Sequence, residues 1–189
     1  MKSAGVRLCL CLALLGALLA GALQAQEKRQ DPRAVKAAGL GQLALYCKWP
    51  ESAFKSKDEP LRIGVLGADP FGETLDALLK GKLHGSHPLQ PVRFPSLAEL
   101  SECQMLFVPQ KEEAQLARVL EICKDKPVLV VCENAALAQK GAAVALYFER
   151  AKLRITVNLD ALREARIEAS SELLKLVRVI GTRKECESR

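Results

Sequence analysis

The chain has 189 residues, of which 49% are hydrophobic and 26% are charged, with a formal net charge of +6. This length and apolar content suit one domain with a real hydrophobic core. Aromatic residues make up only 4%, and acidic and basic residues are interspersed without a Lys/Arg tract. The composition therefore argues against nucleic-acid binding, which depends on basic patches and stacking aromatic side chains.

Residues 1–25 have the three parts of a secretory signal peptide. Lys2 and Arg7 provide the positive start, residues 8–23 are almost wholly apolar or small, and Ala25 offers a small-residue cleavage site. A membrane anchor is the alternative, but the apolar run is close to the lower length limit for spanning a bilayer. We therefore expect an exported, soluble protein that is cleaved near Ala25, followed by a linker and helix cap over residues 26–33.

Helices and strands alternate in the first half of the predicted domain. Asp31 as N-cap and Pro32 at the first helical position predict a helix that ends near Trp49. Its apolar stripe consists of Ala37, Leu40, Ala44 and Cys47. A strand is expected over residues 61–66, and Asp69-Pro70 repeats the cap signature for a helix that reaches about Leu79.

The middle of the chain predicts a mostly parallel sheet. Residues 87–94 read as a strand near a sheet edge, because two prolines interrupt it. Residues 105–108 and 128–131 are continuous apolar runs, which are typical of strands buried on both faces. A core-facing helix around residues 116–123 and a short one over residues 134–140 complete the alternation. We therefore predict an α/β fold, with three layers and helices flanking a mostly parallel sheet.

The C-terminal part predicts an antiparallel hairpin and a covering helix. Residues 142–148 and 153–159 are two β-rich runs joined by a charged turn, and the second alternates apolar and polar side chains. Apolar residues at helical spacing follow Ser170-Ser171 and end at Gly181. The hairpin should form the sheet edge and the helix should cover it. The predicted domain spans residues 34–181 and leaves residues 182–189 as a polar tail.

The chain beyond Ala25 keeps five cysteines, which are Cys47, Cys103, Cys123, Cys132 and Cys186. An oxidising compartment favours disulfides, but an odd number leaves at least one thiol free. Cys103 begins a predicted strand and Cys123 ends the helix that returns over the sheet, so both should reach the same sheet edge. Cys103–Cys123 is the candidate disulfide. The alternative is that Cys47, Cys123 and Cys132 are small buried apolar residues.

Candidate ligand and catalytic motifs are weak. The turn over residues 64–72 could hold an anion at a helix N-terminus, but it lacks nucleotide-binding spacing, and Asp69 would repel a phosphate. His84 and His87 are too few ligands for a metal site. No nucleophile elbow and no paired-carboxylate site is present in the sequence. We therefore predict no enzyme activity, no metal and no cofactor.

Five residues are candidates for a partner or ligand surface, namely Gly67, Asp69, Phe71, Asn158 and Arg178. The first three lie at the strand-to-helix turn and the last two in the C-terminal block. Each also has a structural interpretation: a place in the turn for Gly67 and Phe71, a cap at Asp69, a solvent-facing edge position at Asn158, and a helix C-cap at Arg178.

Several blocks together resemble the YfiR-like family of bacterial periplasmic proteins. They are residues 35–38 through Lys48-Trp49-Pro50, residues 65–72, Gly81-Lys82, Cys103 with Leu106-Phe107-Val108, Pro127-Val128-Leu129, and the closing block with Asn158-Leu159 and residues 170–179. The chain departs from the family at three points. Gly39 and Gly41 replace aromatic residues, Lys140-Gly141 replaces a paired glycine, and His87 replaces an arginine.

The resemblance implies a periplasmic negative regulator that holds an inner-membrane diguanylate cyclase inactive. Cyclic-di-GMP signalling and biofilm formation would then respond to envelope or redox conditions. An outer-membrane lipoprotein could relieve the repression, a sensor kinase could replace the cyclase, and the regulator could be a homodimer. Disulfide state matters in the family, and Cys103 matches a family position. The competing interpretation is a periplasmic small-molecule binding protein, with its site at the C-terminal strand ends near residues 67–72.

Overall fold

The computed structural model describes residues 31–181. The predicted signal peptide, residues 26–30 of the predicted linker, the polar tail and Cys186 lie outside the described residues. The helices are α2 (Pro32–Tyr46), α3 (Glu73–Leu79), α4 (Leu116–Cys123), α5 (Ala135–Ala138), α6 (Leu159–Glu164) and α7 (Ser171–Leu176), with 3-10 turns at Glu51–Ala53, Leu97–Glu99 and Gln110–Gln115. The strands are β1 (Cys47–Lys48), β2 (Leu61–Leu66), β3 (Leu83–His84), β4 (His87–Phe94), β5 (Met105–Val108), β6 (Leu129–Cys132), β7 (Val144–Glu149), β8 (Lys152–Asn158), β9 (Glu168–Ala169) and β10 (Arg178–Ile180).

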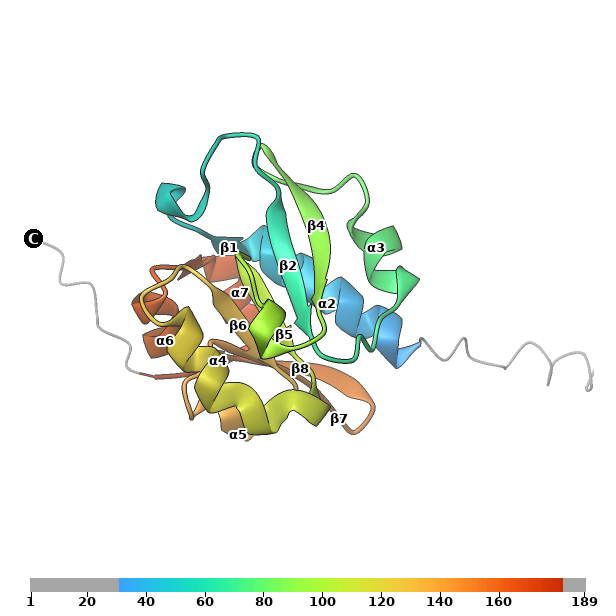
Figure 1. Cartoon of the computed structure of the whole chain (residues 1–189). Helices are drawn as coiled ribbons and strands as arrows, with labels where there is room; N and C mark the ends of the chain where they lie inside the picture. Colours follow the sequence, from blue (N-terminus) through green and yellow to red (C-terminus); the bar gives the residue numbers. More distant parts are fainter. Residues whose placement is uncertain (1–30, 182–189) are drawn as a thin grey trace, which may run out of the picture. The chain divides into compact units, whose positions relative to one another are not determined.

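The main sheet has eight strands in the order β10-β8-β7-β6-β5-β2-β4-β3 (Figure 1). Neighbours from β4 through β7 are parallel, as are β8 and β10, whereas β7–β8 and β3–β4 are antiparallel. Strands β5 and β6 are buried along their whole length. The predicted α/β fold class is confirmed, and β4 lies next to the edge strand as its prolines indicate.

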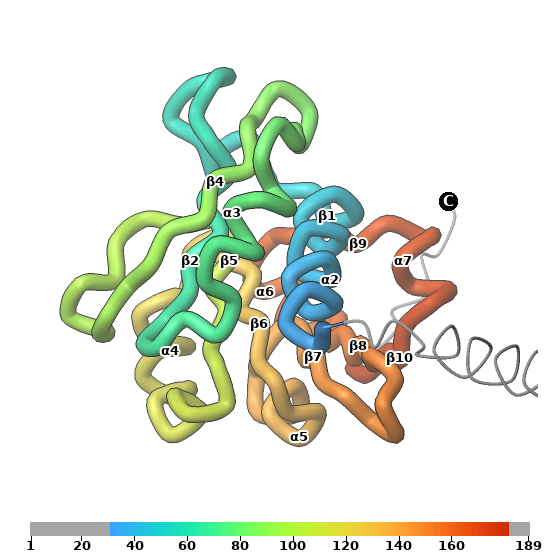
Figure 2. The backbone as a smooth tube through the Cα atoms, turned by 90° about the vertical axis from the view of Figure 1, so that its right-hand side faces the viewer, coloured from blue at the N-terminus to red at the C-terminus, as the bar shows by residue number. Residues whose placement is uncertain are grey.

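Helices cover both faces of the sheet and create two cores. Helices α2 and α3 bury their apolar residues on one face, together with residues of α6 and α7. Helices α4 and α5 bury theirs on the other face. Figure 1 shows α2 behind β2 and α4 in front of β5 and β6. Figure 2 shows α2 at the side of the sheet. This three-layer arrangement follows from strands that are apolar on both faces.

The two glycines of α2 allow this helix to pack closely. A Cβ atom at Gly39 would lie 3.1 Å from a methyl of Leu146 and 3.2 Å from one of Leu153. A Cβ atom at Gly41 would lie 3.4 Å from a methyl of Leu79. Both positions face the core, so the glycines serve helix–sheet and helix–helix packing rather than a partner surface.

Helix α3 begins later than its sequence predicts. Gly72, with φ of 55°, stands at the N-cap position, and a residue in this conformation cannot continue a right-handed helix. Asp69 therefore caps a turn instead of the helix: its Oδ1 accepts a hydrogen bond of 2.7 Å from the N–H of Phe71. The Asp-Pro signature marks a turn here.

The hairpin β7–β8 closes through a two-residue loop of Arg150 and Ala151, with φ values of 50° and 60°. Such turns match the twist of the strands, but residues with a Cβ atom adopt them at a cost. We predict that Ala151→Gly raises the free energy of unfolding by about 0.5–1 kcal/mol. Urea denaturation measures the change. The matched control is Ala165→Gly at the C-cap of α6, where φ is −75°, so no strain is relieved.

The C-terminal region differs from its prediction in two ways. Asn158 does not face solvent on an edge strand, because its Oδ1 accepts hydrogen bonds from the N–H groups of Asp160 and Ala161 and so caps α6. The predicted last helix stops at Leu176, and the chain continues as β10 beside β8. Arg178 is thus a strand residue, and the hairpin is not the edge of the sheet. Ser170 caps α7, since its Oγ accepts a hydrogen bond from the N–H of Leu173.

A second, two-stranded sheet joins the two ends of the domain. Strand β1 directly follows α2 and pairs antiparallel with β9, with Cys47 opposite Ala169. The N–H of Ser170 also donates to the carbonyl of Tyr46 over 2.9 Å. The end of the first helix is therefore fixed to the start of the last one.

Candidate functional site

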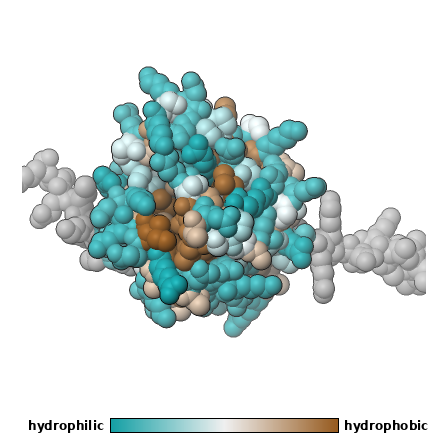
Figure 3. All heavy atoms as spheres, viewed as in Figure 1, coloured by the Kyte–Doolittle hydropathy of each residue, from teal (hydrophilic) through white to brown (hydrophobic). Residues whose placement is uncertain are grey.

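A cavity of about 480 Å³ lies at the amino ends of β5 and β6, and we call it the thiol pocket. Its lining is Ser52, Ala53, Phe54, Lys55, Glu59, Leu100, Ser101, Glu102, Cys103, Gln104, Ile122, Cys123, Lys126, Pro127 and Val128. Figure 3 shows apolar side chains gathered on this face, beside the C-terminal end of α4. The pocket therefore combines an apolar interior with a few polar groups, as small-ligand and peptide sites commonly do.

Gln104 holds one wall of the thiol pocket in place. Its buried side chain accepts a hydrogen bond of 2.8 Å from the N–H of Arg62 and donates one of 2.8 Å to the carbonyl of Ala53. Its own carbonyl accepts a hydrogen bond of 2.9 Å from the indole of Trp49. The segment between β1 and β2, which supplies Phe54 and Lys55, is thereby fastened to β5.

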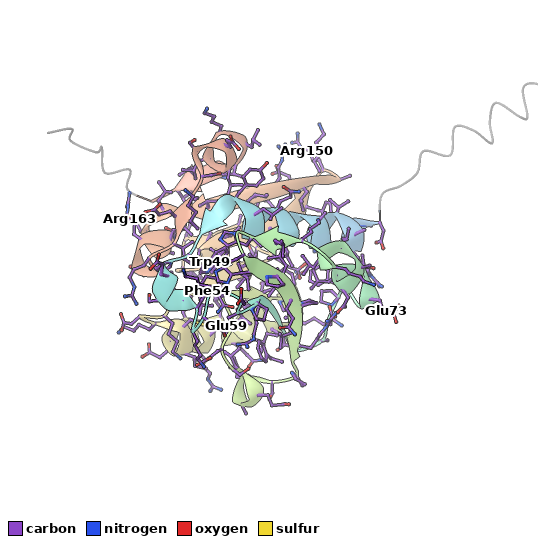
Figure 4. All side chains as sticks on the ribbon, turned by 90° about the horizontal axis from the view of Figure 1, so that it is seen from above. Trp49, Phe54, Glu59, Glu73, Arg150 and Arg163 are labelled. Carbon is purple, nitrogen blue, oxygen red and sulfur yellow. The ribbon has the colours of Figure 1, made fainter. Side chains whose placement is uncertain are left out.

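Phe54 and Glu59 are fixed by His87 at the start of β4. The ring of His87 stacks on Phe54 with centroids 3.7 Å apart and an interplanar angle of 11°. His87 Nδ1 also hydrogen-bonds the carbonyl of Glu59 over 2.7 Å. Figure 4 shows Trp49, Phe54 and Glu59 gathered in one region. His87 is thus a packing residue of this wall.

The structure brings Cys103 and Cys123 to the same pocket as free thiols, with exposed fractions of 7% and 9%. Burial, and to a smaller degree the nearby Cys123, raises the pKa of Cys103 to about 12. Burial also raises the pKa of Cys123, and Lys126 opposes that shift. Both thiols are therefore protonated and weakly nucleophilic at neutral pH. Their pairing as a disulfide stays a prediction.

The other described cysteines lie away from this pocket. Cys47 is buried where β1 meets β9, and Cys132 is buried at the carboxyl end of β6. The single S–H of Cys132 can donate a weak hydrogen bond to the carbonyl of Asn134 or of Val144, at 3.4 Å and 3.5 Å from Sγ. Burial raises the pKa of Cys47 to about 12 and that of Cys132 to about 11. Both behave as small apolar core residues.

Charged side chains surround the mouth of the thiol pocket. Lys55 forms an ion pair with Glu102, and this bond lowers the pKa of the carboxyl group. Glu59 pairs with Arg62 over 3.2 Å, and Lys126 completes the rim. The rim thus carries both signs of charge around an apolar interior.

The stability of this region should depend on pH through His84. Its ring meets the Trp49 indole edge-on at 5.4 Å, and burial lowers its pKa below 6.5, with His87 adding to the shift and the Ala44 carbonyl opposing it. Because the unfolded chain then binds the proton more readily, stability should fall as pH drops from 6.5 through the folded-state pKa. We predict a smaller loss of Tm between pH 7.5 and 5 for His84→Gln than for the wild type, measured by Trp49 fluorescence. Equal losses would contradict this assignment.

Side chains pack against the turn after β2, where the sequence predicts a crevice. Glu112 lies on Gly67, where an added Cβ would be 2.3 Å from its carboxylate. Arg93 binds Asp69 over 3.0 Å and also pairs with Asp76, which lowers the pKa of the Asp76 carboxyl. Phe71, with 3% exposed, packs against Phe107 in the core. The structure thus gives Asp69 and Phe71 roles in the turn and the core.

Arg178 lies at a different place, in a groove of about 510 Å³ that we call the hairpin groove. Its lining is Gln42, Tyr46, Tyr147, Glu149, Leu153, Arg154, Ile155, Leu173, Leu176, Val177 and Arg178. Asn158 is not among these residues and instead caps α6. The sequence does not predict this groove, because the groove forms where α7 ends at Leu176 instead of continuing to Gly181.

Two general features bear on the class of protein. Residues 31–181 contain no group of three or more His, Cys, Asp or Glu side chains placed to hold a metal ion. Among these same residues, no helix has the length and apolar character that crossing a membrane requires. The fold and the pocket define an α/β domain with a partly apolar cavity.

The chain belongs to the YfiR/HmsC-like family, whose sequence pattern it matches over residues 33–178. Members of this family are periplasmic regulators connected with cyclic-di-GMP signalling, and they act with membrane signalling proteins. The comparison with curated proteins gives no match.

The comparison with solved structures gives two matches for part of the chain. A conserved domain protein of Vibrio cholerae O1 biovar El Tor is 10% identical, with a TM-score of 0.51, and the match covers 80% of this chain and 60% of that one. The ABC domain in complex with L-Trp from Streptococcus pneumoniae is 12% identical, with a TM-score of 0.47 and coverage of 63% and 55%. The chain thus spans little more than half the length of either protein. At such identities, the Vibrio likeness shows the fold alone.

Proposed function

We propose that this protein is a non-enzymatic periplasmic regulator that holds an inner-membrane signalling protein inactive by direct contact. A diguanylate cyclase of the cyclic-di-GMP pathway is the proposed partner, with a sensor kinase as the alternative, and an outer-membrane lipoprotein could sequester the regulator. Family membership supports this class of function. The observation that carries the gating mechanism is the pair Cys103 and Cys123, which lie together at one apolar pocket.

The proposed gate is the thiol pocket itself. A Cys103–Cys123 bond would join the start of β5 to the end of α4 and so fix the position of Ile122, an exposed apolar residue of the pocket. Reduction would release the end of α4. A change confined to the pocket could thereby favour one of two binding states, which is how a local redox event biases a partner.

A cross-linked pull-down from intact cells, with and without reductant, tests this function. The expected result is recovery of an inner-membrane cyclase or kinase in an amount that reductant changes. Cys103→Ser should remove the reductant effect, whereas Cys132→Ser, at a buried thiol outside the pocket, should keep it. Recovery of no membrane protein by the wild type would overturn the proposal.

A second candidate function is small-molecule binding, which the volume and apolar lining of the thiol pocket favour. Native mass spectrometry of the purified protein distinguishes the two. A co-purifying molecule that Ile122→Trp displaces, with no membrane partner recovered, would establish the binding protein instead. A protein free of small molecules that recovers a membrane partner would exclude it.

A further inference from the structure

The open edge of β8 is the feature that carries a further inference. The two-residue loop makes Glu149 and Lys152 a hydrogen-bonded pair. Along the hairpin, hydrogen-bonded pairs then alternate with pairs whose backbone groups point away from the partner strand. The N–H of Asn158 bonds the carbonyl of Ala143 over 2.9 Å, which agrees with this alternation. The backbone N–H groups of Leu153 and Ile155 therefore point away from β7, toward the other edge of β8.

Strand β10 covers only part of this edge. It pairs with Thr156 to Asn158, starting with Arg178 opposite Thr156. Within residues 31–181, no strand pairs with the Lys152–Ile155 half of β8 on that side. Helix α7 extends to Leu176, so the strand that follows it begins opposite Thr156 and does not pair with the earlier residues of β8. An unpaired strand edge is a template for one more extended segment.

The open edge lies beside the hairpin groove, which offers apolar contacts. Leu153 and Ile155 are half-buried there, and Leu176 at the end of α7 is 85% exposed. An added strand would place alternate side chains toward this groove, because successive side chains of a strand point to opposite faces. Figure 2 shows α7 and β10 beside α2 and the hairpin.

The charges around the open edge of β8 determine which kind of segment can bind there. Glu149 is paired with Arg154 over 3.4 Å. Arg150, Lys152 and Arg178 are exposed and form no ion pair within the described residues. The surroundings of the edge are therefore basic, and they favour acidic side chains on the segment that binds.

We propose that the Lys152–Ile155 edge of β8 and the hairpin groove bind an extended, acidic, alternately apolar segment of a partner protein by strand addition. The segment continues the sheet beside β8, its apolar side chains fill the groove, and its carboxylates meet Arg178 and Lys152. The proposal deepens the proposed function and rests on it only for the identity of the partner. A second copy of this chain is less suitable, because two basic edges would repel each other.

Three labelled decapeptides test the proposal by fluorescence anisotropy at low salt. One alternates Val and Glu, the second alternates Val and Lys, and the third is the Val/Glu peptide with N-methyl groups on one edge of its backbone. Only the first should bind well. Amide chemical shifts in NMR should change at Leu153 and Ile155 and around the groove. Binding of all three alike, or of none at millimolar concentration, would overturn the proposal.

Matched variants locate the site on the protein. Leu176→Asp should weaken binding of the Val/Glu peptide by about tenfold or more, because it removes an apolar contact and adds a repelling charge. Leu83→Asp is the control, since Leu83 is 55% exposed on β3 at the other end of the sheet. Equal effects of the two variants would overturn the assignment.

Two further outcomes separate this surface from the proposed function. If the protein sediments as a dimer that Leu176→Asp dissociates, the edge belongs to a second copy and the partner-segment proposal is wrong. If Leu176→Asp leaves peptide binding intact while the membrane partner is still recovered from cells, this surface alone is overturned and the regulatory function stands.

Discussion

Protein that has folded under oxidising conditions should contain a Cys103–Cys123 disulfide and should be about 3 kcal/mol more stable than its reduced form. The bond would close a loop of about 20 residues, and the stabilisation comes mainly from restricting the unfolded chain. Both thiols already line one pocket of the folded state. Urea denaturation with and without reductant measures the difference.

The control for this prediction is Cys103→Ser, for which reductant should no longer change the free energy of unfolding. Peptide mapping of the oxidised protein identifies the bond. Pairing of Cys103 with Cys47 or Cys132, or a free Cys103 after oxidative folding, would contradict it. Oxidation of the folded, reduced protein should be slow without a catalyst, because the raised pKa values leave very little thiolate to react.

Replacing the buried Gln104 by Leu should lower the free energy of unfolding by about 2–4 kcal/mol. The substitution leaves the N–H of Arg62 and the carbonyl of Ala53 without their partners in a partly buried place. It should also release the wall of the thiol pocket that carries Phe54. Thermal and urea denaturation measure the loss of stability, and Trp49 fluorescence reports on the wall.

Gln139→Leu is the matched control for this second prediction, because Gln139 is exposed at the end of α5 and its side chain makes no buried bond. Its expected effect lies within about 0.5 kcal/mol. A Gln104→Leu protein as stable as the control would show that the two backbone groups find other partners. The assigned role of Gln104 would then be wrong.

Periodicity and turn chemistry predict most of the sheet, but not the end of the chain. The apolar runs that became β5 and β6 are buried in any α/β arrangement, so their sequence suffices. Leu173, Leu176, Val177 and Ile180 fit helical spacing, yet β-branched residues also favour strands. Whether these residues form a helix or a strand depends on the free edge of β8. That edge is a feature of the tertiary structure and cannot be read from the local sequence. Asn158 carried a usable signal, because Asn followed by Asp160 is typical of a helix N-terminus.

The sequence predicts only the part of the thiol pocket that contains the two cysteines. The crossover rule places Cys103 and Cys123 at one sheet edge, and both residues line the thiol pocket. Phe54, Lys55 and Glu59 come from an irregular segment without periodicity. Its conformation depends on Gln104 and His87, which are distant in sequence, so no local pattern could place it.

The small sheet of β1 and β9 has a consequence for how the protein folds. Cys47 pairs with Ala169, so the first helix reaches its final partners only when nearly the whole chain is present. Pairings between residues so far apart in sequence form late and slow the search for the native state. In a chain exported from its N-terminus, β1 would stay unpaired until the segment that carries β9 arrives. Chaperones that shield unpaired strands should therefore speed its maturation, and chains that lack β9 should be degraded.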